Sequence, residues 1–163
     1  MQRIETRTFL QRIAAQPLRC ACYTAILSLG LGMASLAQGG SSDTPIAFHS
    51  IAQGTTSGIA APQALVIQSA SAWQELWRQH APSGPPPPID FATEFVVGVF
   101  LGQQPTAGYQ VQVVRVEEGD SEVRVIYQVH NPPPEALVAQ VLTQPFHLIR
   151  MPRLGLPIRF IKY

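Results

Sequence analysis

The residues that could do chemistry in this chain are few, and they form no familiar pattern. The histidines are His49, His80, His130 and His147, which are too widely spaced for a short metal-binding motif. Asp90 and Glu94 are four residues apart, but no second acidic segment answers them, so a carboxylate pair for glycoside chemistry has little support. The common hydrolase, peptidase and phosphate-loop motifs are missing. We expect no enzyme activity, no metal and no cofactor, with a metal site assembled only by the fold as the alternative.

A better candidate for a working surface is the loop of residues 102–109 (GQQPTAGY), which joins the runs EFVVGVFL and YQVQVVRV. Pro105 fixes φ at a turn position, Thr106 can hydrogen-bond to the loop backbone, and Gly108 can supply a positive φ. These features place Thr106 and Ala107 at the tip, where small residues let another chain approach the backbone closely. A plain turn is an equally good interpretation, because loops on rigid strands serve both purposes.

The helix expected in this chain covers residues 71–80. Ser71 and Gln74 have the spacing of a capping box, in which each side chain satisfies a free backbone group at the start of a helix. Trp73 and Trp77 lie on one apolar stripe, which we expect to be buried in the core.

Strands are expected where apolar residues run continuously or alternate, at 64–68, 95–101, 109–116, 123–129, 146–151 and 158–161. The run 95–101 is apolar throughout, as in a central strand that is buried on both faces. The alternation in 109–116 slips at Val114, which indicates a β-bulge. Several short strands and one helix predict a single α+β domain over residues 48–163, built mainly on an antiparallel sheet.

The N-terminal residues have the pattern of a targeting segment. Four arginines lead into an apolar run from Tyr23 to Ala37, which ends in small residues. This pattern predicts a signal peptide over residues 1–37, followed by a flexible leader over residues 38–47. The run is short for a membrane span, and an uncleaved N-terminal anchor is the alternative. We expect export to the periplasm or the medium and no membrane span in the mature chain.

Composition limits the partners of the exported part. Removal of residues 1–37 takes away four arginines and one glutamate, which leaves 7 basic and 9 acidic residues and a formal charge of −2. Such a surface gains little from counterion release, so we expect no nucleic acid partner. Cys20 and Cys22 both precede the apolar run, so the exported part has no cysteine for a disulfide, a nucleophile or zinc.

Longer stretches of the sequence resemble a known family. The segments VIQSASAWQELWRQH, PPPPIDFATEFVVGVFLGQQPTAGYQVQV and LTQPFHLIRMP, in this order, are similar to the C-terminal domain of the protease-complex subunit PrcB family. The resemblance runs from about Ile46 to Phe160. It implies an exported or lipid-anchored protein associated with a protease complex. Together with the missing catalytic motifs, this predicts a non-catalytic interaction domain whose partner is another envelope or secreted protein, such as a protease. The binding residues expected from the loop and from the Thr143–Phe146 segment are Gly102, Pro105, Thr106, Ala107, Gly108, Tyr109, Thr143, Pro145 and Phe146.

A shorter resemblance points to a different activity. Residues 105–109 are similar to the Asn-Pro-Thr-Thr-Gly-Tyr loop of chagasin-type inhibitors, which push such a loop into the cleft of a cysteine protease. Gln104 stands where those inhibitors have an asparagine. The alternatives to an accessory subunit are therefore a chagasin-like inhibitor that uses residues 102–109 and an unrecognised envelope enzyme.

Overall fold

The computed structural model describes residues 43–163. The predicted signal peptide (1–37) and the first part of the predicted leader (38–42) lie outside the described residues. The elements in chain order are β1 (Thr44–Pro45), β2 (His49–Gly54), β3 (Gln63–Ile67), α1 (Ala70–His80), β4 (Glu94–Phe100), β5 (Gln110–Glu118), β6 (Val123–His130), β7 (Phe146–Pro152) and β8 (Ile158–Lys162).

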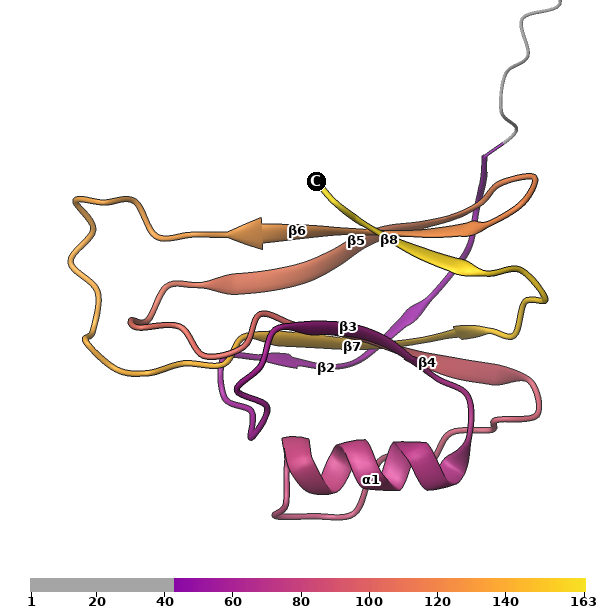
Figure 1. Cartoon of the computed structure of the whole chain (residues 1–163), viewed down its shortest axis with the longest axis horizontal. Helices are drawn as coiled ribbons and strands as arrows, with labels where there is room; N and C mark the ends of the chain where they lie inside the picture. The colour runs from indigo at the N-terminus through magenta and orange to yellow at the C-terminus, as the bar shows by residue number, and fades with distance from the viewer. Residues whose placement is uncertain (1–42) are drawn as a thin grey trace, which may run out of the picture. The chain divides into compact units, whose positions relative to one another are not determined.

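These strands form two sheets that pack face to face. The first sheet has the strand order β1-β5-β6-β8, and the second has the order β2-β7-β4-β3. Neighbouring strands are antiparallel except β6 and β8, which run parallel. Figure 1 shows the first sheet above the second and α1 below both, so α1 covers the outer face of the second sheet. The predicted α+β class, with mainly antiparallel sheet and one short helix, is confirmed.

Strand β4 contributes side chains to two hydrophobic cores, one between the sheets and one beneath α1. It lies between β7 and β3 and is buried from Phe95 to Phe100, which confirms the predicted central strand. Successive side chains of a strand point to opposite faces. Phe95 and Val97 therefore belong to the core between the sheets, while Val96 and Phe100 belong to the core beneath α1. Burial of each such side chain contributes about 1.5–3 kcal/mol.

The start of α1 differs from the prediction. Ser69, and not Ser71, is the N-cap, because its side chain accepts a hydrogen bond from the backbone nitrogen of Ala72 at 3.3 Å. The predicted capping box at Ser71 is therefore wrong. The predicted apolar stripe packs against the second sheet, with Trp73 and Leu76 buried, but Trp77, which was also expected to be buried, is only half-buried.

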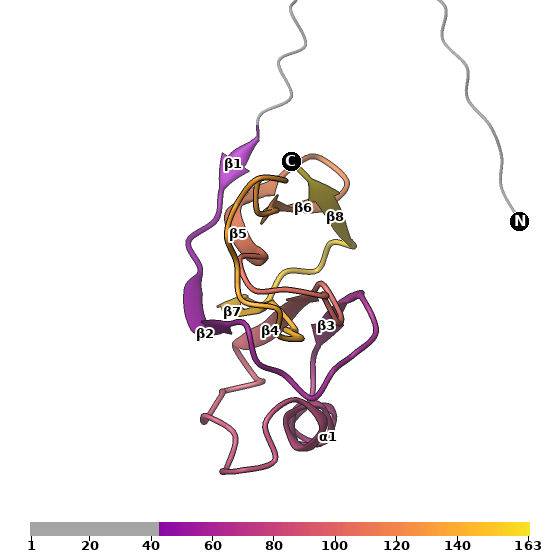
Figure 2. The same ribbon diagram turned by 90° about the vertical axis from the view of Figure 1, so that its left-hand side faces the viewer.

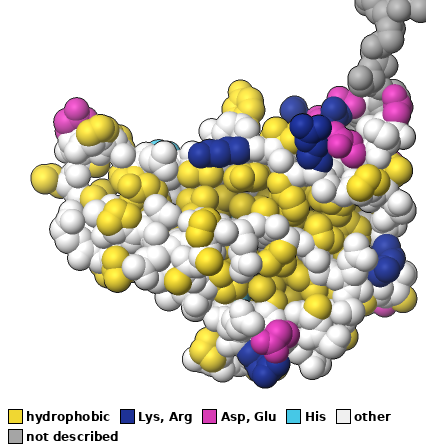
Figure 3. All heavy atoms as spheres, in the orientation of Figure 1, with side chains coloured by type: hydrophobic (Ala, Val, Ile, Leu, Met, Phe, Trp, Pro, Cys, Tyr) yellow, Lys and Arg dark blue, Asp and Glu magenta, His cyan; other side chains and the backbone are white. Residues whose placement is uncertain are grey.

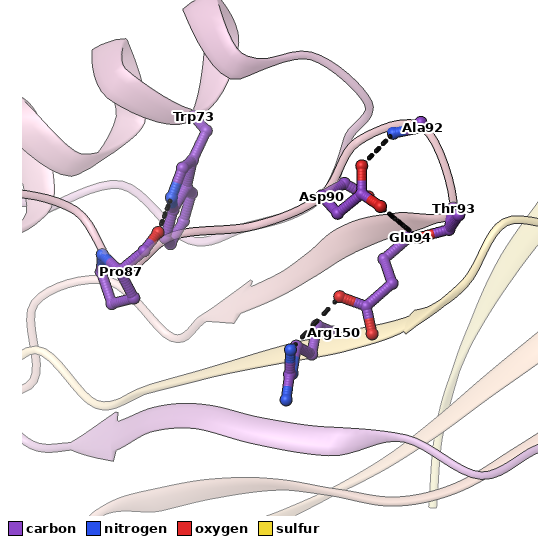
Figure 4. A network of polar contacts seen from close by, with 7 residues as sticks. All are labelled: Trp73, Pro87, Asp90, Ala92, Thr93, Glu94 and Arg150. Atoms are coloured by element: carbon purple, nitrogen blue, oxygen red, sulfur yellow. Dashed lines mark hydrogen bonds and ion pairs between the residues drawn. The ribbon is translucent and has the colours of Figure 1, made fainter.

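The proline-rich connector after α1 folds back along the helix. The indole nitrogen of Trp73 donates to the Pro87 carbonyl at 2.9 Å (Figure 4), and that of Trp77 donates to the Gly84 carbonyl at 3.1 Å. Trp73 thus buries its ring and satisfies its polar nitrogen at the same time, while the ring of Trp77 stays half-buried. These two bonds hold the connector between α1 and β4 in place.

The chain becomes a strand earlier than the predicted leader allows. β1 pairs with residues 117–118 of β5, and the next residue, Ile46, donates a backbone hydrogen bond to β5 at 2.9 Å. Ile46 and Phe48 pack against the core between the sheets. The prediction of a flexible leader through residue 47 is therefore wrong from Thr44 onward, because the two apolar side chains anchor a segment whose neighbours are small and polar.

The slip predicted in 109–116 is a β-bulge in β5. The register between β5 and β6 shifts between Val113 and Arg115, so Val114 has no opposite residue and its side chain is 42% exposed. Next to the bulge, the backbone nitrogen of Val113 donates to the Nδ1 atom of His147 in the facing sheet, at 2.8 Å. The bulge therefore lies beside a polar link between the two sheets.

Candidate functional site

Two glycines with positive φ shape the loop of residues 102–109. Gly102 has φ 70° and Gly108 has φ 95°, a region that side chains disfavour. A Cβ atom at Gly102 would lie 2.7 Å from the Ala60 carbonyl oxygen, and one at Gly108 would lie 2.9 Å from Pro132. The positive φ predicted at Gly108 is confirmed, and both turns are packed closely against other loops.

The segment of residues 131–145, which joins β6 to β7, lies along this loop. Gln104 and Thr143 exchange backbone hydrogen bonds of 2.7 and 3.0 Å. The Thr143 hydroxyl donates to the Thr106 carbonyl at 2.9 Å. The sequence left open whether the Thr143–Phe146 segment lies near the loop, and the fold brings the two together.

Further backbone bonds tie the loop on both sides. The Ala107 nitrogen donates to the Ala139 carbonyl at 3.0 Å, and the Gln103 nitrogen donates to the Ala60 carbonyl at 2.9 Å. Ala60 belongs to residues 55–62, between β2 and β3. Three connections that are distant in sequence therefore meet at one end of the sandwich, on the left in Figure 1. We call this surface the loop end.

The nine predicted binding residues differ in the surface that they present. The buried residues are Gly102, Thr143, Pro145 and Phe146. The half-buried residues are Thr106, Ala107, Gly108 and Tyr109. Of the nine, only Pro105 is exposed. Thr106 and Ala107, predicted to form a tip, are thus partly covered by the 131–145 segment.

The large apolar side chains that the loop end exposes belong to the 131–145 segment. Leu137 is fully exposed, while Val141 and Leu142 are 51% and 58% exposed. Single exposed apolar residues are ordinary, but three within one short connection suggest a surface that is covered by a partner. The sequence reasoning missed them because it treated the segment as a connection. The available signal was the run ALVAQVL, which is apolar but lacks the alternation of a strand.

A polar hollow lies beside the loop end. It has a volume of about 410 Å³, and its lining residues are Gln53, Gly54, Thr55, Gln110, Val111 and Gln112. The amide side chains offer hydrogen bonds without charge. The combination of exposed apolar side chains and neutral hydrogen-bonding groups suits a protein surface better than a charged small molecule.

The two acidic residues considered for catalysis have structural contacts. One Asp90 oxygen accepts from the Ala92 backbone nitrogen at 3.1 Å and the other accepts from the Thr93 hydroxyl at 2.9 Å, which shapes the turn before β4 (Figure 4). Glu94 pairs with Arg150 of β7, with 3.3 Å between nitrogen and oxygen. Each carboxylate thus has its own partners, and no contact joins the two in the described structure.

Within residues 43–163, two serine–histidine contacts bring a hydroxyl close to a possible base. Ser57 Oγ lies 2.8 Å from His80 Nδ1, and both residues are buried. The His80 ring stacks edge-on against Phe146, with 4.2 Å between ring centroids. Burial lowers the pKa of His80, so its ring is neutral at pH 7. This pair lies in the core beneath α1, where it fixes the end of the helix.

The second contact involves His147 of β7. It is buried, and its Nδ1 atom accepts from the Val113 nitrogen, so Nε2 carries the proton toward Ser50 Oγ at 3.0 Å. Burial lowers the pKa of His147 as well. His147 therefore acts as a neutral link between the sheets.

Within residues 43–163 no group of three or more histidine, cysteine, aspartate or glutamate side chains is arranged to hold a metal ion. In the same part of the chain, no helix has the length and apolar character needed to cross a membrane.

Comparison with known proteins gives one match. Neither the curated proteins nor the solved structures contain a match to this chain. The match is to a family model described as PrcB C-terminal, and it covers β4, the 102–109 loop, β5, β6, the 131–145 segment and β7. Residues 95–152 thus match the PrcB C-terminal family, as the strand and loop motifs of the sequence predicted.

Proposed function

We propose that this chain is an exported, non-catalytic interaction domain that acts as an accessory subunit of a secreted or envelope protease complex. The observation that carries the proposal is the match of residues 95–152 to the PrcB C-terminal family. The resemblance seen in the sequence links that family to a protease complex. The basic and apolar pattern of residues 1–37 supports export.

The loop end is the surface that we assign to the partner. The family match includes both of its main parts, the 102–109 loop and the whole 131–145 segment. Backbone hydrogen bonds hold these parts together, so little ordering entropy is lost on binding. Leu137, Val141 and Leu142 supply the apolar contacts.

The inhibitor alternative receives less support from the geometry. An inhibitor of this kind needs a loop that projects into a cleft, whereas Thr106 and Ala107 are half-buried against the 131–145 segment. We therefore propose binding by the whole loop end and not by an inserted loop.

The test uses the full chain with an affinity tag, recovered from the envelope and the medium. We expect a protease to co-purify with it. The combined variant Leu137→Ser, Val141→Ser and Leu142→Ser should reduce this recovery about tenfold or more, because apolar contacts in an interface core carry much of the affinity. Its melting temperature should hardly change, since exposed substitutions usually alter stability by about 0.5 kcal/mol or less.

Tyr163→Ser is the matched control, because it removes an exposed apolar side chain (82% exposed) outside the loop end. Full recovery of the protease with the triple variant would remove the loop end from the proposal. Inhibition of papain by the wild type, lost in Thr106→Arg, would support the inhibitor instead. N-terminal sequencing should find Gln38 at the start of the recovered protein, whereas retention of Cys20 would favour an anchor.

A further inference from the structure

Of the four edge strands in the described part of the chain, three carry features that discourage further pairing. β1 is two residues long and contains Pro45, which has no backbone N–H. The register of β2 is irregular between Ser50 and Ala52. β8 carries the charges of Arg159 and Lys162. Natural sheets use short edges, prolines, bulges and charges to prevent the addition of a foreign strand.

Strand β3 has none of these protections. Its five residues, QALVI, include no charge and no proline, and its register with β4 is regular. Gln63 and Ala64 are exposed. Within the described residues, no side chain or loop is hydrogen-bonded to its backbone on the side away from β4.

The free edge of β5 shows the contrast. The Val111 carbonyl accepts from the Gln53 side chain at 3.0 Å, and the Val113 nitrogen donates to His147 at 2.8 Å. Side chains thus occupy the outward backbone groups of β5, while those of β3 are left for another partner.

A hollow of about 280 Å³ lies beside β3 on the side of the first sheet. The residues that line it are Pro62, Gln63, Ala64, Val99, Phe100, Leu101, Tyr127, Val129 and Lys162. Figure 2 shows β3 and β8 on the same side of the sandwich, and Figure 3 shows hydrophobic side chains gathered across the middle of this face. We call this side, with β3 and β8, the open side.

A second hollow, of about 320 Å³, lies on the other face of β3, against α1. The residues that line it are Gln63, Leu65, Val66, Ile67, Ala72, Glu75, Leu76 and Gln79. A strand added beside β3 would point alternate side chains to its two faces, because the side-chain period of a strand is two. The two hollows are placed to receive those two sets of side chains.

We propose that β3 binds an extended segment of a partner protein as a fifth strand of the second sheet. Main-chain hydrogen bonds to β3 supply the affinity. Each hollow receives the side chains of every second residue of the segment and favours apolar ones. A carboxylate on the first-sheet side pairs with Lys162, which is exposed and has no ion-pair partner within the described residues.

The charge of Lys162 decides between a partner and a second copy. Pairing of two β3 strands would bring QALVI, which contains no carboxylate, against Lys162. A partner segment that contains an acidic residue satisfies both the strand edge and the charge. This inference concerns a different surface from the loop end and does not depend on a protease, so its failure leaves the proposed function standing.

The test uses a capped six-residue peptide of alternating valine and threonine with one glutamate, added to isotope-labelled full chain. We expect the NMR signals of β3 amides to shift, and the outward amides to exchange with solvent at least about tenfold more slowly. Two further peptides carry N-methyl groups on one or the other alternate set of amides. Because only one set faces β3, only one of these peptides should lose binding.

Two variants sharpen the result. Ala64→Trp fills the hollow beside the first sheet and should abolish binding, whereas Gln140→Trp, at an exposed position of the 131–145 segment, should not. Lys162→Glu should weaken the glutamate peptide about fivefold and favour a peptide with lysine in its place.

The proposal is overturned if both N-methylated peptides bind as well as the parent, which indicates non-specific adsorption. It is also overturned if β3 amides do not respond to the parent peptide. Sedimentation that finds a dimer, lost in Ala64→Trp, without peptide binding would assign the edge to a second copy.

Discussion

The two sides of the sandwich treat their strand edges differently. On the side of β1, β2 and the free edge of β5, which we call the bridged side, the chain itself crosses from one sheet to the other between β1 and β2. Gln53 and His147 add side-chain hydrogen bonds between the sheets. On the open side, β3 and β8 flank a hollow, and no hydrogen bond in the described part of the chain links β3 to the first sheet.

This difference separates stability from binding. Both sides share the core between the sheets, so the hollow on the open side does not result from a poorly packed core. On the bridged side, the outward backbone groups of β5 form hydrogen bonds within the protein. On the open side, the outward backbone groups of β3 are left free, and an added strand can satisfy them. We therefore expect substitutions on the bridged side to change the free energy of unfolding, and substitutions on the open side to change binding.

The largest effect should come from removing the His147 link. His147→Leu leaves the buried Val113 N–H without an acceptor and should lower the free energy of unfolding by about 2–4 kcal/mol. His147→Asn keeps an oxygen near the position of Nδ1 and should recover at least about 1 kcal/mol of that loss. Urea unfolding of the three proteins measures both values. Equal losses in the two variants would show that the hydrogen bond is not what stabilises this side.

Acidification should weaken the fold through the same histidine and His80. Burial holds the pKa of both below the ordinary value of 6.5, so the unfolded chain takes up protons first as the pH falls. Stability is then fully present above pH 6.5 and declines as the pH drops toward the folded-state values, by up to about 1.4 kcal/mol per pH unit for each histidine.

Unfolding measured at pH 7.5, 6.5 and 5.5 reports this slope. His147→Asn should remove the contribution of His147 to the pH dependence of stability and leave the contribution of His80. If the stability of His147→Asn depends on pH as steeply as that of the wild type, His147 does not contribute to the pH dependence.

Substitutions that enlarge a side chain should distinguish the two sides by a smaller change in the free energy of unfolding. Val113→Leu overfills the packed bridged side and should cost about 1–3 kcal/mol. Ala64→Leu extends into the hollow on the open side and should be neutral or stabilise by up to about 1 kcal/mol. Thermal melts of the pair test the comparison, which fails if Ala64→Leu is the more damaging change.

The smallest effect is expected in hydrogen exchange at the native state. Alternate amides of β3 face away from β4 and should exchange at least about tenfold faster than those bonded to β4. The Val113 amide, which donates to His147, should be protected although it lies on the free edge of β5. Uniform protection along β3 would indicate that something covers the open side in solution.

The sequence predictions were accurate for features that depend on neighbouring residues and less accurate for features that depend on residues distant in sequence. The continuous run 95–101 predicted the central strand, and the slip at Val114 predicted the bulge, because both are written in local periodicity. The N-cap was misplaced by two residues, since Ser69 and Ser71 are both acceptable caps by residue type, and the structure shows the Ser69 side chain accepting from the Ala72 nitrogen.

For the candidate site, the sequence identified the 102–109 loop and its Gly108 turn but not its surroundings. Nothing local to the loop indicates that Thr143 bonds to Thr106, because the two residues are 37 positions apart. The exposed residues of the 131–145 segment escaped notice for the same reason. An apolar residue in a connection is recognised as surface only when the fold shows that no core receives it.

The sequence by itself determined the helix, most strands and their buried faces, because side-chain alternation and the 3.6-residue period need only neighbouring residues. It also determined that residues 38–163 contain no cysteine. The tertiary structure alone decided which strands lie at the edges, that β8 runs parallel to β6, and that His147 meets Val113. Those features depend on the pairing of distant segments, in which each strand has several sterically acceptable partners, and only the packing of the whole core selects one.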